Sequence, residues 1–381
     1  MERAKGSCAS WIRRPENKVL AVVGQPRSKT SPALLGVYAL DTKTALLSPD
    51  PVLTCEMEEE DGNPVGFAVH PSGEEFVCAT TKGCKLFELN DQDFIYKLVP
   101  KVVPPLQSIG LQKCLAFSTD GSKFATGGED GHLRILEWPG LKVVLDEPRA
   151  HKSFRDMDIS LDSEYLVSTS TDGSARIWKI NDAAPLISLT RNSDEKIECC
   201  RFSRDGMKPF LFCTVQKGGK VVTVVWDIST WNRIGFKRLL GKPVSVLSVS
   251  LDGKYLALGS NDGDMCVVEV KKMEISHWSK KLHLGSCISS IEFCPIERIV
   301  ISTSNRGAAV VTKLDVPADW KEWQIYLLLL ALFLGSAAIF YLFYEHSDSF
   351  WNLPSAKKQP NKSYLRSIVP DYQVADEQNP W

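Results

Sequence analysis

The sequence predicts an all-β propeller of seven blades, followed by a single C-terminal transmembrane helix. Strand-like segments with glycine turns recur between residues 65 and 314, and an uncharged run, Trp323–Tyr344, comes after them. The 381 residues carry 45 basic and 46 acidic side chains. A chain this close to neutral lacks the broad positive field that nucleic-acid binding uses, so we expect no nucleic-acid partner.

The repeated segments share one order of elements. Alternating apolar residues lead to a turn, a second strand, a second turn and a third short strand, in Val65–Leu89, Gln112–Leu136, Arg155–Ile180, Ile197–Ile228, Val244–Val270 and Ile288–Leu314. A weaker first unit, Trp11–Leu40, makes seven. The turns recur about every 42–48 residues, which is the blade length of WD-repeat propellers. Independent hairpins stacked in a sandwich are the alternative, but the regular period favours a closed ring with only short sheet edges.

Each unit has a second tight turn between its second and third strands. These turns are Lys82-Gly83, Asp130-Gly131, Asp172-Gly173, Gly218-Gly219, Asp262-Gly263 and Arg306-Gly307. We expect their glycines to supply the positive φ of two-residue hairpins. Trp178 and the pair Trp226-Asp227 stand where the closing Trp-Asp of a WD repeat belongs.

The run Trp323–Tyr344 is the predicted membrane span. Its length of about 33 Å as a helix matches a hydrocarbon core of about 30 Å, and aromatic residues lie at both ends. A buried core helix is the alternative, but such helices rarely lack a polar face at this length. The expected organisation is a propeller over residues 1–315, a linker over 316–322, the span over 323–344 and an unstructured tail over 345–381.

Cysteine usage and the N-terminus predict which side of the membrane the propeller faces. The first 18 residues contain no apolar signal region, and all eleven cysteines precede the span without a disulfide spacing. We therefore expect a cytosolic propeller and a lumenal C-terminal tail. The sequon Asn361-Lys362-Ser363 lies in that tail, so we expect N-glycosylation at Asn361.

No catalytic constellation is recognisable in the sequence. The six histidines are scattered, and there is no nucleophile elbow, phosphate-binding loop or zinc-protease motif. We therefore expect no catalytic residue, no metal site and no cofactor, and a chain that is not an enzyme. A propeller without such a site more often presents one face as a docking platform.

The order of parts resembles one family. A cytosolic seven-bladed propeller, the opening Ala9-Ser10-Trp11-Ile12-Arg13-Arg14-Pro15, the blade turns and the late anchor are similar to the endoplasmic-reticulum propellers that load GTP onto the Sar GTPase and start COPII coat assembly. The resemblance extends to about Tyr344. It implies an endoplasmic-reticulum membrane location, with the Sar GTPase and COPII components as partners.

One segment departs from the family pattern. In exchange-active relatives the first blade carries a glycine-rich loop that holds a potassium ion and projects onto the GTPase. The matching GTPase-facing segment here retains one glycine of that run and reads Gly24, Gln25, Pro26, Arg27, Ser28, Lys29, Thr30 and Ser31. Glutamine and proline cannot easily follow a path that needs positive φ and close backbone approach, so potassium is expected only if this loop still functions.

This departure is similar to the plant branch known as the phosphate transporter traffic facilitator. That resemblance implies a propeller that helps membrane-protein cargo, such as phosphate transporters, to leave the endoplasmic reticulum without strong exchange activity. Two alternatives stay open: an active exchange factor for the Sar GTPase that initiates COPII budding, and a scaffold on another membrane. A neutral drift of the loop is also compatible with its sequence.

Overall fold

The computed structural model describes residues 4–92, 95–107, 109–190, 194–207, 209–316 and 322–345. It divides the chain into two compact units, residues 1–316 and residues 317–381. Most of the predicted linker 316–322 and of the predicted tail 345–381, including Asn361, lies outside the described residues.

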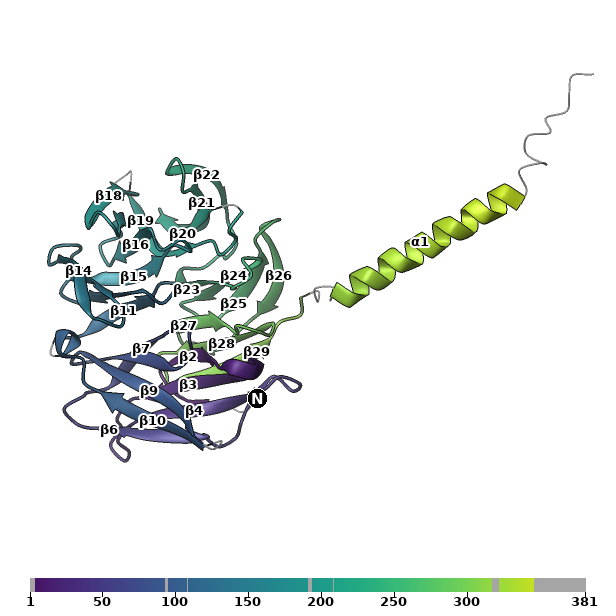
Figure 1. Cartoon of the computed structure of the whole chain (residues 1–381). Helices are drawn as coiled ribbons and strands as arrows, with labels where there is room; N and C mark the ends of the chain where they lie inside the picture. The colour runs from purple at the N-terminus through teal and green to yellow at the C-terminus, as the bar shows by residue number, and fades with distance from the viewer. Residues whose placement is uncertain are drawn as a thin grey trace, which may run out of the picture. The chain divides into compact units, whose positions relative to one another are not determined.

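The first unit contains seven antiparallel sheets that follow one another in chain order, which confirms the predicted seven-bladed propeller (Figure 1). Blade 1 consists of β2 (Cys8–Arg13), β3 (Val19–Gln25), β4 (Ala33–Asp41) and β5 (Leu46–Leu47), with β6 (Leu53–Met57) also paired with β4. Blade 2 consists of β7 (Pro64–Val69), β8 (Glu75–Thr80), β9 (Cys84–Gln92) and β10 (Ile95–Lys101). Blade 3 consists of β11 (Gln112–Phe117), β12 (Lys123–Gly128), β13 (Leu133–Glu137) and β14 (Lys142–Glu147).

The remaining blades repeat this arrangement. Blade 4 consists of β15 (Phe154–Ile159), β16 (Tyr165–Ser170), β17 (Ala175–Lys179) and β18 (Ala184–Ser188). Blade 5 consists of β19 (Glu195–Phe202), β20 (Phe210–Lys217), β21 (Lys220–Asp227) and β22 (Asn232–Lys237). Blade 6 consists of β23 (Val244–Val249), β24 (Tyr255–Ser260), β25 (Met265–Glu269) and β26 (Glu274–Ser279). Blade 7 consists of β27 (Ile288–Phe293), β28 (Ile299–Ser304), β29 (Ala308–Lys313) and β1 (Ala4–Lys5). Two short 3₁₀ helices, Pro15–Asn17 and Pro104–Leu106, lie in the connections.

The ring is closed by the N-terminus. Strand β1 pairs with β29 through Ala4 with Ala309 and Lys5 with Ala308, and the Gly6 N–H donates to the Gly307 carbonyl at 2.9 Å. The last blade therefore contains both the first and the last strand of the propeller, and no blade is left with three strands.

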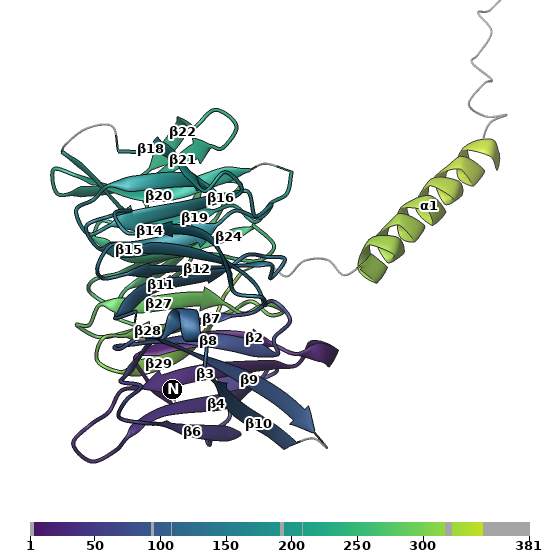
Figure 2. The same cartoon turned by 60° about the vertical axis from the view of Figure 1, so that its left-hand side comes forward.

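The hydrophobic core lies between neighbouring blades. Trp178 of blade 4 packs with Leu133 and Ile135 of blade 3, and Trp226 of blade 5 packs with Val167 and Ile177 of blade 4. The first strand of each blade contacts the first strand of the next, from β2 through β27 and back to β2, so these seven strands surround the axis. Figure 2 shows the propeller from its side, with β3 and β4 near the bottom, β11 and β15 in the middle, and β20 and β22 at the top.

The predicted turns are present, but they are not all two-residue hairpins. Only Gly218-Gly219 directly joins paired residues, Lys217 and Lys220, and both glycines have positive φ. The turn with Asp172-Gly173 instead spans residues 170–174, between the paired residues Thr169 and Ala175, although Gly173 has the expected φ of 87°. Gly83 does not have a positive φ, and in its turn the Thr80 N–H donates to the Gly83 carbonyl at 2.7 Å.

The cysteines lie within the blades, and most of them are buried. Cys199 packs toward blade 6 and Cys200 toward blade 4, so the adjacent pair points to opposite faces of β19, as successive side chains of a strand do.

The described part of the second unit is the helix α1 (Glu322–Glu345), which includes the whole predicted span 323–344. An 18-residue window within Trp323–Glu345 has a mean hydropathy of 2.4, and none of that window is buried by protein. The helix is therefore long and apolar enough to cross a bilayer.

Candidate functional site

The predicted GTPase-facing segment is divided between a strand and a loop. Gly24 and Gln25 belong to β3, where they pair with Leu35 and Leu34 of β4, and are not loop residues as expected from the sequence. The connection itself, here called the first-blade loop, comprises residues 26–32. Its side chains from Pro26 to Pro32 are exposed.

Gly24 is required by packing inside the blade. A Cβ at this position would lie 2.7 Å from Cys8 Sγ, 2.9 Å from Pro64 Cβ and 3.0 Å from Phe67 Cζ. Such distances are shorter than real Cβ contacts. The one glycine that remains of the expected run therefore lets β3 approach blade 2, and it does not shape the loop.

The first-blade loop is held against the connection between blades 1 and 2. The Arg27 backbone N–H donates to Asn63 Oδ1 at 2.8 Å, and the Arg27 guanidinium lies 2.8 Å from a Glu59 carboxylate oxygen. Within the loop, the Ser28 N–H donates to the Ser31 carbonyl at 3.0 Å, and the two serine hydroxyls lie 2.7 Å apart. None of residues 24–32 has a positive φ.

These contacts do not fit a potassium site of the glycine-rich kind. Such a site needs free backbone carbonyls that converge on the ion, which is what close backbone approach at glycines permits. Here the Ser31 carbonyl already accepts a hydrogen bond, and the hydroxyls of Ser28 and Ser31 pair with each other.

Charged side chains surround a groove of about 410 Å³ beside the loop. Lys85 lies 2.6 Å from Asp61, the Lys82 ammonium donates to the Glu59 carbonyl at 2.9 Å, and Lys101 pairs with Glu88. The acidic run Glu58–Asp61 is therefore partly engaged by lysines and Arg27. The groove is polar and mixed in charge.

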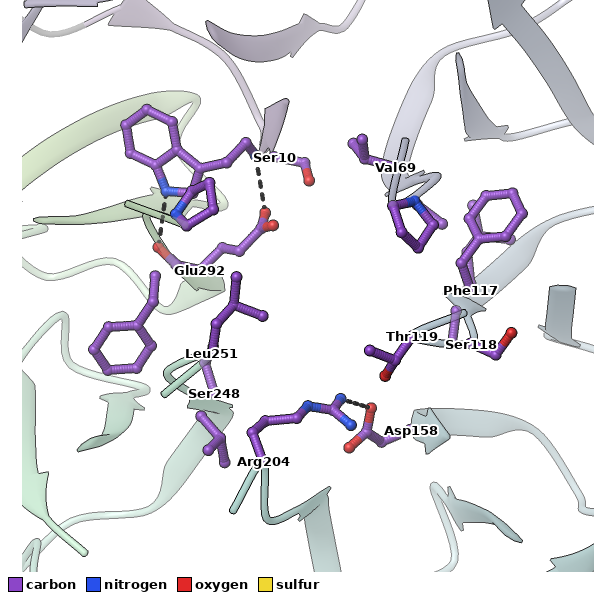
Figure 3. Close-up of a pocket in the computed structure, with 18 of the residues that line it drawn as sticks. Ser10, Val69, Phe117, Ser118, Thr119, Asp158, Arg204, Ser248, Leu251 and Glu292 are labelled. Carbon is purple, nitrogen blue, oxygen red and sulfur yellow. Dashed lines mark hydrogen bonds and ion pairs between the residues drawn. The ribbon is translucent and has the colours of Figure 1, made fainter. Parts of the chain in front are cut away.

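A second cavity, of about 520 Å³, lies in the channel where the seven inner strands end (Figure 3). Every blade contributes to its wall, through side chains such as Ser10, Val69, Phe117, Asp158, Arg204, Leu251 and Glu292. Because Cys8 pairs with Gly24 and Arg13 pairs with Val19, this cavity and the first-blade loop lie at opposite ends of β2 and β3.

Two ion pairs between blades 4 and 5 line or support this cavity. Asp158 lies 2.7 Å from Arg204 and also accepts the Phe202 N–H at 2.8 Å. Asp156 lies 2.6 Å from Arg201 and accepts the Cys200 N–H at 3.0 Å. Both carboxylates therefore join neighbouring inner strands and are not free to act as bases.

Glu292 joins blade 7 to blade 1 in the same cavity. Its carboxylate accepts the Trp11 N–H at 3.1 Å, and its backbone carbonyl accepts the Trp11 indole N–H at 3.1 Å (Figure 3). Burial raises the pKa of Glu292 to about 7, against the opposing effect of hydrogen bonds from Ser10 and Trp11. The sequence carries a partial signal for this channel, because Asp156 and Asp158 stand two residues apart in a strand that also contains Phe154, Met157 and Ile159.

The comparisons with known proteins agree with this architecture. The WD domain, G-beta repeat model matches residues 110–136 and 143–179. The chain is 57% identical over 358 residues to SEC12-like protein 1 of Arabidopsis thaliana, with 92% of this chain and 90% of the relative covered. It is 33% identical to SEC12-like protein 2 of Arabidopsis thaliana, with 67% and 66% covered. The guanine nucleotide-exchange factor SEC12 of Mus musculus is 26% identical over 49% of this chain and 48% of its own. The chain belongs to the SEC12-like family of WD-repeat proteins.

Proposed function

We propose that this protein is an endoplasmic-reticulum membrane propeller that helps membrane-protein cargo leave that compartment and has no strong nucleotide-exchange activity. The observation that carries the proposal is the first-blade loop, whose backbone is tied to Asn63 and whose Arg27 is paired with Glu59. Residues 26–32 also contain no glycine, so the loop lacks the residues that would let its backbone approach a GTPase closely. By resemblance, the cargo class is phosphate transporters.

The proposed location rests on α1 and the family. We place the propeller in the cytosol and the segment after α1 in the lumen, with Asn361 glycosylated. The test is a glycosidase-sensitive mobility shift that disappears in Asn361→Gln. Digestion of the tail by protease added to intact microsomes would contradict this orientation.

The test of the exchange assignment is GDP release from a Sar-type GTPase on liposomes that carry the full chain. The expected result is release at the rate of the GTPase alone, beside clear acceleration by mouse SEC12 as the positive control. Replacing Gln25 to Lys29 with a glycine-rich sequence should raise release if the loop is the missing part. Acceleration by the unaltered chain comparable to that of mouse SEC12 would overturn the proposal.

An active exchange factor is the second candidate. It is favoured by the similarity to mouse SEC12 and by two cations, Arg27 and Lys29, that the first-blade loop exposes. In that case the unaltered chain accelerates release, and Arg27→Ala with Lys29→Ala removes most of the acceleration. The double variant has no effect under the first proposal.

A further inference from the structure

We propose that the outer edge of blade 6, residues 271–281, lies on the anionic lipid surface of the membrane that holds α1. The inference rests on the proposed membrane anchor and adds a second contact between the protein and the bilayer. Residues 271–281 include the whole of β26 and are called the β26 edge below.

The composition of the β26 edge suits a lipid surface. It reads Lys-Lys-Met-Glu-Ile-Ser-His-Trp-Ser-Lys-Lys, with four lysines against one glutamate. Paired lysines therefore stand at both ends of a strand that carries an isoleucine and a tryptophan. Lysine ammonium groups are attracted to anionic headgroups, and tryptophan favours the boundary between headgroups and hydrocarbon.

The structure exposes these side chains. All four lysines are exposed, and Ile275 and Trp278 are 41% and 39% exposed, although they are large and apolar. Val268 pairs with Ile275 and Cys266 pairs with Trp278, which places both side chains on one face of the strand. Strand β26 is the last strand of its sheet, so the edge is open to a partner (Figure 1).

The β26 edge lies where the chain leaves the propeller. The Asp315 backbone N–H donates to His277 Nδ1 at 3.3 Å, and Leu314 and Val316 pack in the hydrophobic cluster between blades 6 and 7. His277 is the neighbour of Trp278. The last described residues of the propeller are thus in direct contact with β26.

The length of the connection limits how far this edge can be from the bilayer. Seven Cα steps separate Val316 from Trp323, and a fully extended chain of that length spans at most about 25 Å. The six residues of β26 extend over about 20 Å. If Trp323 is at the membrane interface, Val316 lies within about 25 Å of it, and the connection is long enough to let the neighbouring β26 edge reach the headgroups.

The charge of the β26 edge suits an anionic surface, and the proposed anchor α1 together with the exposed Trp278 favours a lipid one. Lys272 lies 3.1 Å from Glu269, an exposed pair of little energetic weight, and Lys271 has no such carboxylate partner among the described residues. Glu274 is the one acidic side chain of the edge. Asp315 lies outside the edge, with its carboxylate 3.7 Å from Nδ1 of His277. Asp264 accepts the Lys281 backbone N–H at 2.8 Å but is itself paired with Lys242, so the four lysines of the edge face the carboxylates of Glu274, Glu269 and Asp315.

The test is hydrogen–deuterium exchange of the full chain in nanodiscs of phosphatidylcholine alone or with about 30% phosphatidylserine. We expect amides 274–281 to exchange about fivefold or more slowly in the anionic discs, since each lysine near such a surface shifts the contact equilibrium by about that factor. Lys271→Glu with Lys272→Glu should abolish the difference, and Trp278→Ala should reduce it. Lys142→Glu with Arg149→Glu is the matched control and should leave the difference unchanged, since these exposed cations lie in β14 of blade 3 and just after it.

Slow amide exchange in β24, the buried strand of the same blade, shows that a variant is folded. If a variant exchanges faster in β24, Lys271→Gln with Lys272→Gln takes its place. Equal exchange at the β26 edge in both lipids, in a chain that resists alkaline extraction, overturns this inference and leaves the anchor intact. Protection that requires an added cargo protein and not phosphatidylserine also overturns it. If alkaline treatment extracts the chain from membranes, both the proposed anchor and this inference are contradicted.

Discussion

Trp178 donates its indole N–H to the hydroxyl oxygen of Ser168 across 2.8 Å, deep inside blade 4. The same oxygen lies 2.7 Å from Nε2 of His151, so three side chains from separate parts of the blade meet at one hydroxyl. His151 stands at the entry to the blade, Ser168 in its second strand and Trp178 in its third. The polar atoms of the core satisfy one another, and this fixes the register of the blade.

Replacement of Trp178 by phenylalanine should destabilise the propeller by about 2 kcal/mol or more, because it removes a buried hydrogen bond and part of a ring that fills the core. The measurement is urea unfolding of the propeller fragment, residues 1–316. Trp278→Phe changes the same ring at an exposed site and should cost much less. Equal losses in both variants would show that the hydrogen bond to Ser168 contributes little.

Burial, with a smaller effect of Arg176, lowers the pKa of His151 to about 4 from an ordinary value of 6.5. A histidine that is harder to protonate in the folded state contributes stability at neutral pH, and this is lost as pH falls from 6.5 through 4. The contribution is at most about 3 kcal/mol. His151→Gln should therefore flatten the dependence of unfolding free energy on pH in that window, and an unchanged slope would contradict the shift.

The contribution of Glu292 to the pH dependence of stability should have the opposite sign to that of His151. Its carboxyl takes up a proton more readily in the folded state, so stability is greatest below pH 4.5 and is lost as pH rises through about 7. Glu292→Gln retains an acceptor for the Trp11 N–H and should raise stability at pH 8 by at most about 3 kcal/mol, with little change at pH 4. Unfolding at the two pH values measures both effects. A variant that is less stable at pH 8 would mean that the ionised form is favoured in the channel.

Gly24→Ala should destabilise the propeller by about 1–3 kcal/mol, because the new Cβ has no room beside Cys8, Pro64 and Phe67. Gly66→Ala is the matched control in the adjoining strand β7, where nothing lies within 4 Å of an added Cβ. Thermal unfolding distinguishes the two. If both alanines are tolerated, the close approach of blades 1 and 2 is more adaptable than the structure indicates.

The sequence predicted the inner part of each blade because those strands are buried on one or both faces and end in glycine or serine-aspartate turns. The outer strands were not predicted. In β22, for example, Ile234 and Phe236 are exposed, so no alternation distinguishes the strand from a loop. Strand β1 has only two residues, and its partner β29 lies about 300 residues away, so no local pattern could indicate the pairing.

The candidate sites show the same limit. The sequence located the altered first-blade segment, but it could not show that Gly24 packs against blade 2 or that Asn63 holds Arg27. The contact of Glu292 with Trp11 joins residues 281 positions apart and follows only from closure of the ring. Local patterns identified which residues to examine, and the tertiary structure determined what each of them does.

The closure of the last blade also determines how the propeller bears mechanical load. A pull transmitted from the C-terminal side enters the propeller at the end of β29, which lies between β28 and β1. Force along this strand must shear hydrogen bonds on both of its sides, where an edge strand would peel away from one neighbour. The N-terminal residues therefore act as a clamp on the strand that takes up tension from the tether.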